Sequence, residues 1–383
     1  MINVGVITGN HYPRLGGMEI AVHNLVKKMQ PINGVSTAVA CSTMPEISKS
    51  FQYPYPCYRA KSFSFLTPYL FKINQIKMIR ENNINILHGP MLHGGGFDAV
   101  KLSSKLNIPA VVHSRGSDVQ MVKEINYGAQ LDAKSLEKIK FAIQHSNHII
   151  AVSDINKKNL IELGAQNDKI SVIPNGILIN EINNIPFQEV RNKYGLSLDD
   201  FVLIAVGRNR PIKRMELLFK ALSLLKSYKK IKCLCVGPKE NLGVLAKKYN
   251  VQDNVIITGK IPLKNDISQE QPYAELINAY RSANLYISTS YVESFGNAAA
   301  DALACGIPVV IGQKHGVKDI IIEGKTGWTM PQENENSLAE LIISLYQKRE
   351  SILNDKEKIK ESVSHLTWHN IALQTVEVYK SML

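Results

Sequence analysis

The chain has 383 residues, of which 45% are hydrophobic and 20% are charged, and its formal net charge is +12. This composition is ordinary for a soluble globular protein, and the length suggests two domains. No apolar run reaches the roughly 18 residues that a membrane-spanning helix needs, so we expect no such helix. The opening sequence MINVGVIT lacks the basic start of a signal peptide and is typical of a first strand.

The cysteines fit no metal-binding spacing. Cys233 and Cys235 alternate within KCLCVG, so we predict that they share one face of a strand as core thiols. A reduced, cytoplasmic setting is the simplest interpretation of this cysteine usage. The five cysteines are Cys41, Cys57, Cys233, Cys235 and Cys305.

Positive charge is concentrated in the first half of the chain. Residues 1–180 hold 19 Lys and Arg against 11 Asp and Glu, a surplus of 8 out of the total of 12. A surface of this kind attracts anionic lipid or nucleic acid, and the alternative is a solvated surface that only keeps the protein soluble.

Short apolar, β-rich runs alternate with amphipathic helical patterns along the chain, which predicts an α/β protein whose parallel sheets are covered on both faces. The polar, Asn-rich stretch 177–200 separates two series of similar size. We therefore predict two doubly wound, Rossmann-like domains that face a deep cleft. The predicted strands are 4–8, 37–40, 84–88, 110–113 and 148–152, then 202–206, 232–236, 255–258, 285–288 and 309–311, and predicted helices include 19–29, 214–225 and 274–282.

Gly16 and Gly17 stand between the first predicted strand and the helix that follows it. Glycines at this place let the backbone approach a ligand, and the helix start offers free N–H groups to a phosphate or a sugar hydroxyl. The spacing is not that of the dinucleotide fingerprint G-x-G-x-x-G. A flexible turn is the alternative.

A basic loop, GRNRPIKR, follows the first strand of the second series. Open α/β sheets bind ligands beyond the carboxyl ends of their strands. Arg208 and Lys213 are therefore candidates for holding a diphosphate, with Arg as a two-pronged donor and Lys as a point charge. A solvated basic loop is the alternative, and Arg210 and Arg214 leave open which cations point inward.

The segment STSYVESFGNAAADALACGIPVV places two acids in small, apolar surroundings. We predict a loop over 288–294 and a helix over 296–305, whose first-turn N–H groups at Phe295, Gly296 and Asn297 lack partners within the helix. Glu293, beside Ser294, is placed to accept hydrogen bonds from sugar hydroxyls. Asp301 lies about two turns into the helix and is placed to reach a ribose diol. Without the neighbouring motif, an acid on the helix surface would be the preferred interpretation.

The spacing of the histidines predicts no metal site. His88 and His93 lie five residues apart, but no acid or third histidine completes a set of ligands, and no D-x-D triplet occurs. His113 ends a predicted strand, where a lone histidine is more often structural than catalytic.

The order and spacing of these motifs resemble those of glycosyltransferase family 4 (glycosyl transferases group 1), which are retaining enzymes with the GT-B fold. The similarity covers nearly the whole chain and includes the acid-x7-acid pattern of Glu293 and Asp301. Other matching segments are VVHSRGSD, ISVIPNGI, VGRNRPIK, VIITGKIP, ACGIPVV, IIEGKTGW and TWHNIALQTVEVYKSML.

The resemblance implies an N-terminal acceptor domain over 1–180 plus about 365–383, a linker over 181–194 and a C-terminal donor domain over 195–364. It implies that Arg208 and Lys213 hold the donor's diphosphate, that Glu293 contacts the donor sugar near the amides of 295–297, and that His113 lies beside the transferring sugar. Asp301 stands where the family usually has Glu, so the ribose contact is one methylene shorter. In the segment ISVIPNGI we expect a turn at Pro174–Gly176 and no site.

The resemblance and the residues together predict a metal-independent transferase that uses a nucleoside diphosphate sugar, UDP-linked in preference to GDP-linked. We expect a glycan acceptor, lipid-linked, in the synthesis of surface polysaccharide or glycoconjugates. The segment 63–80 interleaves aromatics with Lys72, Lys77 and Arg80. It suggests a contact with the inner face of a membrane, or else a buried helix with snorkelling lysines.

Two other functions compete with this prediction. A sugar-nucleotide epimerase of the same architecture would interconvert two sugar nucleotides without an acceptor. A non-catalytic, basic protein that binds glycans or nucleic acid would need a base-stacking or groove-reading device, and the sequence offers neither, so we expect no nucleic-acid partner.

Overall fold

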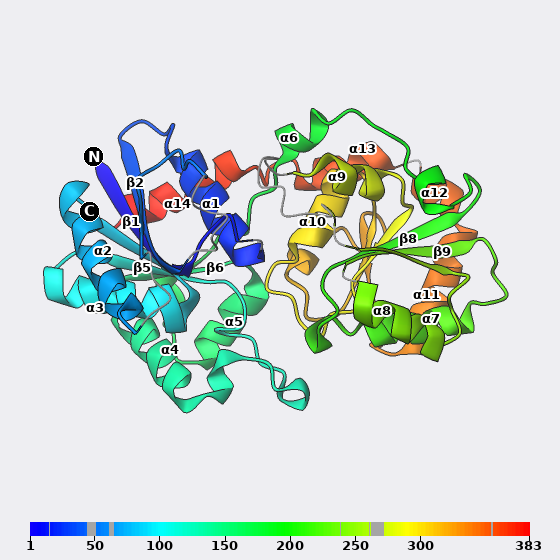
Figure 1. The fold of residues 1–383 in the computed structure, drawn as a ribbon, viewed down its shortest axis with the longest axis horizontal. Coiled ribbons are helices and arrows are strands. Elements are labelled where there is room, and N and C mark those ends of the chain that lie inside the picture. Colours follow the sequence, from blue (N-terminus) through cyan, green and yellow to red (C-terminus); the bar gives the residue numbers. More distant parts are fainter. Residues whose placement is uncertain are drawn as a thin grey trace. The chain divides into compact units, whose positions relative to one another are not determined.

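The computed structural model describes residues 1–14, 16–43, 51–60, 65–237, 239–259, 261, 272–353 and 355–383. The chain folds into two compact units, one of Met1–Gly176 with Leu366–Leu383 and the other of Ile177–His365. Each unit has its own parallel sheet with helices on both faces (Figure 1).

The first unit is built on a seven-stranded sheet of order β3-β2-β1-β4-β5-β6-β7. The chain runs outward from β1 to β3 and then returns to place β4 on the other side of β1, so the direction of winding changes between β1 and β4. The strands are β1 (Ile2–Asn10), β2 (Val35–Thr43), β3 (Cys57–Arg59), β4 (Ile86–Pro90), β5 (Ala110–Ser114), β6 (His148–Ala151) and β7 (Ile170–Val172). The main helices are α1 (Gly17–Met29), α2 (Thr67–Glu81), α3 (Phe97–Leu106), α4 (Ala133–His145), α5 (Asp154–Glu162) and α14 (Trp368–Lys380).

Continuous apolar strands explain why this sheet is covered on both faces. Every residue of β4 and of β5 is buried, as expected for central parallel strands. The C-terminal helix α14 packs beside α1 in this unit, although it lies at the far end of the sequence (Figure 1). Thr367 caps α14 by accepting a hydrogen bond from the Asn370 N–H at 3.2 Å.

The second unit repeats the plan with a six-stranded sheet of order β10-β9-β8-β11-β12-β13. Here the winding reverses between β8 and β11, which pair in parallel with Leu285 opposite Leu203. The strands are β8 (Phe201–Val206), β9 (Ile231–Val236), β10 (Val255–Gly259), β11 (Leu285–Ile287), β12 (Val309–Ile311) and β13 (Gly327–Thr329). The helices are α6 (Ile179–Asn183), α7 (Met215–Leu224), α8 (Lys239–Lys248), α9 (Ala274–Arg281), α10 (Asn297–Ala304), α11 (Glu335–Gln347), α12 (Arg349–Leu353) and α13 (Lys356–Val363).

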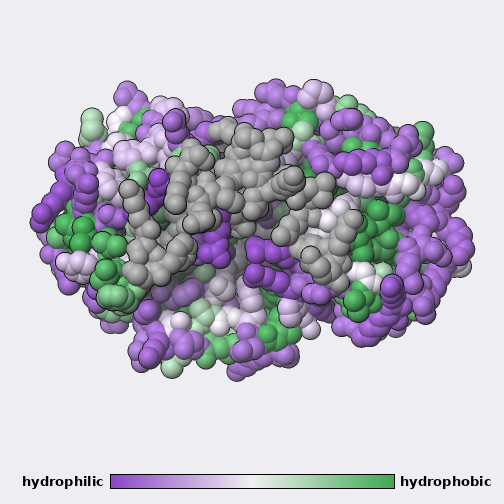
Figure 2. Space-filling view, in the orientation of Figure 1, coloured by the Kyte–Doolittle hydropathy of each residue, from purple (hydrophilic) through white to green (hydrophobic). Residues whose placement is uncertain are grey.

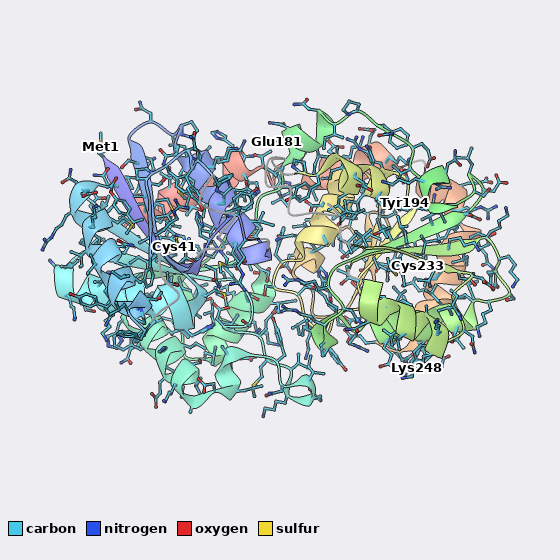
Figure 3. The ribbon with its side chains drawn as sticks, viewed as in Figure 1. Met1, Cys41, Glu181, Tyr194, Cys233 and Lys248 are labelled. Atoms are coloured by element: carbon cyan, nitrogen blue, oxygen red, sulfur yellow. The ribbon has the colours of Figure 1, made fainter. Side chains whose placement is uncertain are left out.

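Polar surfaces surround these cores. Hydrophilic side chains cover most of the described surface that faces the viewer in Figure 2. Cys41 on β2 and Cys233 on β9, both labelled in Figure 3, lie inside their units. The Sγ atoms of Cys233 and Cys235 are 3.7 Å apart and fully buried, which confirms the prediction of core thiols.

Candidate active site

The loops after β8 and β11 come together at the point where the second sheet reverses its winding. Adjacent parallel strands end at the same edge, so residues 207–214 and 288–296 are neighbours. The Tyr291 N–H donates to the Ile212 carbonyl at 2.9 Å. The Thr289 hydroxyl contacts the carbonyls of Lys213 and Arg214, each at 3.0 Å. A small pocket opens between the two loops, lined by Ala205–Gly207, Lys213, Met215 and Tyr286–Ser290.

Lys213 and Glu293 form an ion pair across these loops, with Nζ on Oε1. The Ser290 hydroxyl also donates to Glu293 Oε1, at 2.7 Å. Burial alone would raise the pKa of the Glu293 carboxyl, but the charges of Lys213 and His315 and the two hydrogen bonds outweigh it and lower this pKa. Glu293 is therefore a carboxylate held in place by donors.

Arg208 differs from Lys213. Its side chain is exposed, and its guanidinium makes no hydrogen bond or ion pair among the described residues. Arg214, by contrast, donates to the Glu333 carboxylate at 2.7 Å and lies over the ring of Tyr291, 4.3 Å from its centroid. Arg214 is thus held by its own unit, whereas the Arg208 cation has no hydrogen-bond or ion-pair partner in the described chain.

The turn before α10 is shaped by two glycines. Gly296 caps α10 with φ +99°, a conformation that favours glycine, and a Cβ there would collide with the ring of His315. A Cβ on Gly316 would collide with the Ser294 carbonyl. The Glu293 N–H donates to the Lys314 carbonyl, and the Gly316 N–H donates to the Glu293 carbonyl, both at 2.9 Å. Segment 314–316 therefore fixes the path of Glu293–Gly296.

Helix α10 begins at Asn297, so its first-turn amides face the same edge as the loops. Phe295 is buried and anchors the turn. Asp301 is half-buried in the middle of α10, and its carboxylate accepts no hydrogen bond within the described part of the chain. Burial raises the pKa of Asp301 to about 7. Burial and the charge of Asp301 raise the pKa of Tyr280, whose buried hydroxyl lacks a partner among the described atoms.

Gly16 and Gly17 lie in the first unit, at the start of α1. Gly16 caps the helix in an extended conformation, and its carbonyl accepts the Ile20 N–H at 3.0 Å. A Cβ on Gly16 would collide with the carboxylate of Glu19, which is itself 3.8 Å from the Arg14 guanidinium. Space for Glu19 is one physical reason for glycine here, beside the predicted approach of a ligand.

His113 lies at the carboxyl end of β5 in the first unit and is buried. Its Nδ1 atom is 3.1 Å from Nη2 of Arg115, whose Nη1 donates to Asn175 Oδ1 at 2.6 Å. The ring of His88 lies 5.3 Å from that of His113, centroid to centroid, and its Nδ1 is 2.6 Å from the Tyr379 hydroxyl. The structure thus gathers β4, β5, the 174–176 turn and α14 around His113.

Burial controls the charges in this cluster. It lowers the pKa of His113 well below its ordinary value, and the nearby Arg115 charge adds to the effect. It lowers the pKa of His88 to about 3 and that of Arg115 to about 10. His88 and His113 are therefore neutral imidazoles beside a guanidinium cation.

The sequence predicted His113 as a site residue but not the polar groups around it. Arg115 contacts His113, Asn175 contacts Arg115, and Tyr379 contacts the neighbouring His88. The sequence also did not predict the place of His315. Arg115 was visible in VVHSRGSD, since it is two residues from His113. The others are far from their partners in sequence, and no local pattern marks them.

The described residues contain no group of three or more His, Cys, Asp or Glu side chains that could hold a metal ion. Within the same described ranges, no helix combines the length and the apolar composition needed to cross a bilayer.

Comparison with known proteins matches both units. The sequence model described as Glycosyltransferase Family 4 matches residues 15–181, and that described as Glycosyl transferases group 1 matches residues 186–363. An uncharacterized glycosyltransferase of Methanocaldococcus jannaschii is 26% identical over 97% of this chain and 96% of its own length. D-inositol 3-phosphate glycosyltransferase 2 of Catenulispora acidiphila is 24% identical over 62% of this chain and 56% of its own.

Solved structures show the same fold. Sucrose-phosphate synthase from Thermosynechococcus elongatus superposes with a TM-score of 0.82 at 20% identity, over 100% of this chain and 99% of that one. Anabaena HepE in complex with UDP and glucose superposes with a TM-score of 0.76 at 16% identity, over 100% of both chains.

Two parallel, doubly wound sheets that match such structures over their whole length define a GT-B protein, which confirms the predicted fold class. With both units matched by glycosyltransferase families, the protein is a glycosyltransferase, similar to group 1 and family 4.

Proposed function

We propose that this glycosyltransferase moves a sugar from a nucleoside diphosphate sugar to a glycan acceptor, with retention of the anomeric configuration. The observation that carries the proposal is the meeting of loops 207–214 and 288–296 at the reversal of the second sheet, with Lys213 and Glu293 in contact. A UDP-sugar is favoured over a GDP-sugar, since Anabaena HepE, similar in fold, is seen in complex with UDP and with UDP-glucose.

The second unit is proposed to bind the donor. Arg208 and Lys213 stabilise the negative charge that develops on the leaving diphosphate, and the amides of 295–297 at the start of α10 add to this field. These groups supply the positive charge that a divalent ion supplies in metal-dependent transferases, so we propose no metal cofactor.

The carboxylates have different proposed roles. Glu293, with Ser294 beside it, accepts hydrogen bonds from hydroxyls of the donor sugar. Asp301 accepts from the nucleotide ribose. Gly16 and Gly17 allow the backbone to approach the donor, and His113 contacts the transferring sugar. The leaving phosphate accepts the acceptor's proton, so that no carboxylate nucleophile is required.

A donor screen tests this proposal directly. Thermal unfolding is measured with UDP, GDP and their sugar conjugates, followed by product analysis with lipid extracts as acceptors, with and without a chelator. We expect a UDP-sugar to raise the melting temperature and to give a retained linkage at early times. Two sugar nucleotides interconverting without acceptor would instead indicate epimerase activity, and no response to any sugar nucleotide would overturn the proposed donor class.

We further propose that the acceptor is lipid-linked and that α2 rests on the inner face of a membrane. Exposed apolar side chains gather at the start of this helix: Phe65, Leu66, Tyr69 and Ile73 are 90%, 46%, 64% and 44% exposed. Lys72, Lys77 and Arg80 are exposed on the same helix, although Lys77 lies 3.8 Å from Glu81. An apolar stripe beside cations suits an anionic bilayer surface. Phe63 and Ser64, the start of the predicted segment, lie outside the described residues.

Vesicle pelleting tests this surface. Binding to vesicles of phosphatidylglycerol and phosphatidylcholine should fall when Lys72, Lys77 and Arg80 become Ala, and again with Tyr69→Ala. The matched control replaces Lys134, Lys140 and Lys158, three exposed lysines of the same unit, by Ala. Equal losses in both triple variants would show general charge attraction and would count against a role of α2.

A further inference from the structure

The hydrogen bond between Arg115 and His113 fixes which ring nitrogen of the histidine carries the proton. A guanidinium has only N–H donors, so at the 3.1 Å contact with Arg115, the His113 Nδ1 atom must accept. A neutral imidazole that accepts at Nδ1 carries its proton on Nε2. Burial and the Arg115 charge keep the pKa of His113 low, so the ring is neutral and Nε2 is an N–H donor.

Asn175 holds Arg115 in this position. Its Oδ1 atom accepts from Nη1 at 2.6 Å, while Nη2 of the same guanidinium reaches His113. Asn175 is buried in the turn Pro174–Gly176, and a Cβ on Gly176 would overlap Trp368 at the start of α14. Packing within the first unit therefore fixes the turn. The turn holds Arg115 through Asn175, and Arg115 in turn holds His113.

The proton on His113 Nε2 has no acceptor in the described part of the chain. This atom is fully buried and unpartnered, as are Nε of Arg115 and Nε2 of His88. Asp118, the acid whose charge acts on Arg115, is occupied: its carboxylate accepts the N–H groups of Leu92 and Gly116 at 3.1 and 2.8 Å. Leaving a buried donor unsatisfied is costly, so such a donor points to a missing oxygen partner.

We propose that Arg115 and Asn175 are positioning residues that lock His113 as the Nε2–H tautomer, so that it donates a hydrogen bond to a hydroxyl oxygen of the transferring sugar. The sugar contact rests on the proposed function, whereas the tautomer is a property of the free protein. An imidazole held in one tautomer, with its N–H already directed at the substrate, does not have to reorganise during the reaction. This preorganisation increases the rate.

The tautomer is measured first, by NMR of the full-length protein with ¹⁵N-labelled histidine at pH 7. His113→Gln identifies the His113 signals by their loss. We expect a protonated Nε2 and an unprotonated Nδ1 in the parent protein. In Arg115→Met the two tautomers should mix, and Asn175→Ala should give a smaller change in the same direction. A protonated Nδ1 in the parent protein would overturn the proposal.

Kinetics with the identified donor then separate positioning from folding. We expect kcat to fall at least about tenfold in Arg115→Met, with the donor KM changed far less, and Arg115→Lys to recover part of the loss. His113→Gln, whose amide N–H replaces the Nε2 donor, should keep more activity than His113→Asn, and adding Arg115→Met to it should cost little more. If Arg115→Met does not fold, as judged by its thermal melt, Asn175→Ala and Asn175→Asp take its place.

The two arms fail separately. If the tautomer is as expected but the Arg115 and Asn175 variants keep full kcat, the positioning role is wrong while the transferase stands. If no sugar nucleotide is turned over, the proposed function fails and with it the sugar contact, and the NMR result still decides the tautomer.

Discussion

The two clusters described above satisfy their polar groups in different ways. In the first unit, the neutral His88 and His113 and the Arg115 cation leave buried nitrogen atoms without partners among the described residues. In the second unit, Lys213 and Glu293 neutralise each other, while Arg208 stays exposed without a side-chain partner in the described ranges.

This contrast indicates what kind of ligand each cluster can receive. A neutral, buried N–H donor can form a hydrogen bond with an uncharged oxygen, and no ion pair has to break first. A sugar hydroxyl offers such an oxygen. Lys213 can bind an anion only if it shares or gives up its contact with Glu293. The exposed Arg208 can form charge-assisted hydrogen bonds with an anion directly, as a diphosphate requires. Substitutions in the second unit test this contrast.

If Arg208 stabilises charge on the leaving group as proposed, Arg208→Ala should lower kcat/KM about 100- to 1000-fold. The melting temperature should stay unchanged, since the exposed side chain makes no hydrogen bond or ion pair within the described chain. Arg210→Ala is the matched control, an exposed arginine two residues along the same loop, and it should keep nearly full activity. Equal losses in both variants would mean that the loop acts only through its total charge.

Gly296→Ala should lower the free energy of unfolding by about 2 to 3 kcal/mol. The positive φ at this position costs a residue with a Cβ roughly 1–2 kcal/mol, and the collision with His315 adds to it. When His315 is already Ala, the loss in free energy of unfolding caused by Gly296→Ala should be about 1 kcal/mol smaller, as measured by urea denaturation.

Gly243→Ala is the control for this glycine. Gly243 lies in α8, and a Cβ added there would meet no neighbouring atom outside the helix backbone, so the substitution should be neutral or stabilise by about 0.5–1 kcal/mol. If Gly296→Ala lowers the free energy of unfolding equally with and without the His315 ring, the collision does not contribute. Backbone strain would then account for the whole loss.

The sequence predicted the long strands and the loops of the site, but not the contacts between them. β5 was found because its apolar run is continuous, and the loops after β8 and β11 were found because Gly207 and Gly296 interrupt the pattern. The strands β3, β7 and β13 were missed. Like the predicted β11 and β12 they have three residues each, but their sequences CYR, ISV and GWT mix polar residues or glycine with apolar ones, whereas LYI and VVI are continuous apolar runs.

Long-range pairing explains the rest. Lys213 and Glu293 are 80 residues apart, and Arg115 and Asn175 are 60 apart. Only the order of strands in each sheet brings them together, and a single sequence carries no local signal of that order. The prediction of a diphosphate site therefore named two loops that the structure brings together, but it did not anticipate that Lys213 already has a carboxylate partner.

The ion pair of Lys213 and Glu293 should show strong coupling in a double-mutant cycle. Lys213→Met and Glu293→Gln should each lower the free energy of unfolding, because each leaves a half-buried charge without its partner. The double variant should recover about 1.5 to 2 kcal/mol of the summed loss but none of the lost activity. Additive stability losses would show that solvent already screens the pair.

Asp301→Asn should remove a pH dependence of donor binding. A carboxyl whose pKa is raised to about 7 is mostly protonated at pH 6 and mostly ionised at pH 8. Ribose hydroxyls donate to the ionised form, so UDP affinity should rise by up to about tenfold across that range. Glu293, with its lowered pKa, and His315, with a pKa of about 4, keep one charge state throughout.

Calorimetric titration with UDP at pH 6, 7 and 8 measures this effect, and the difference between the parent protein and Asp301→Asn cancels the ionisation of UDP itself. Without ligand, the sign for stability is opposite. The folded state holds the proton above pH 4 where the unfolded state has lost it, so the free energy of unfolding should fall as pH rises from about 4 to 7, and Asp301→Asn should flatten this slope. If the affinity rises equally in both proteins while the stability slopes differ, Asp301 titrates as described but does not touch the donor, and the ribose must be bound elsewhere.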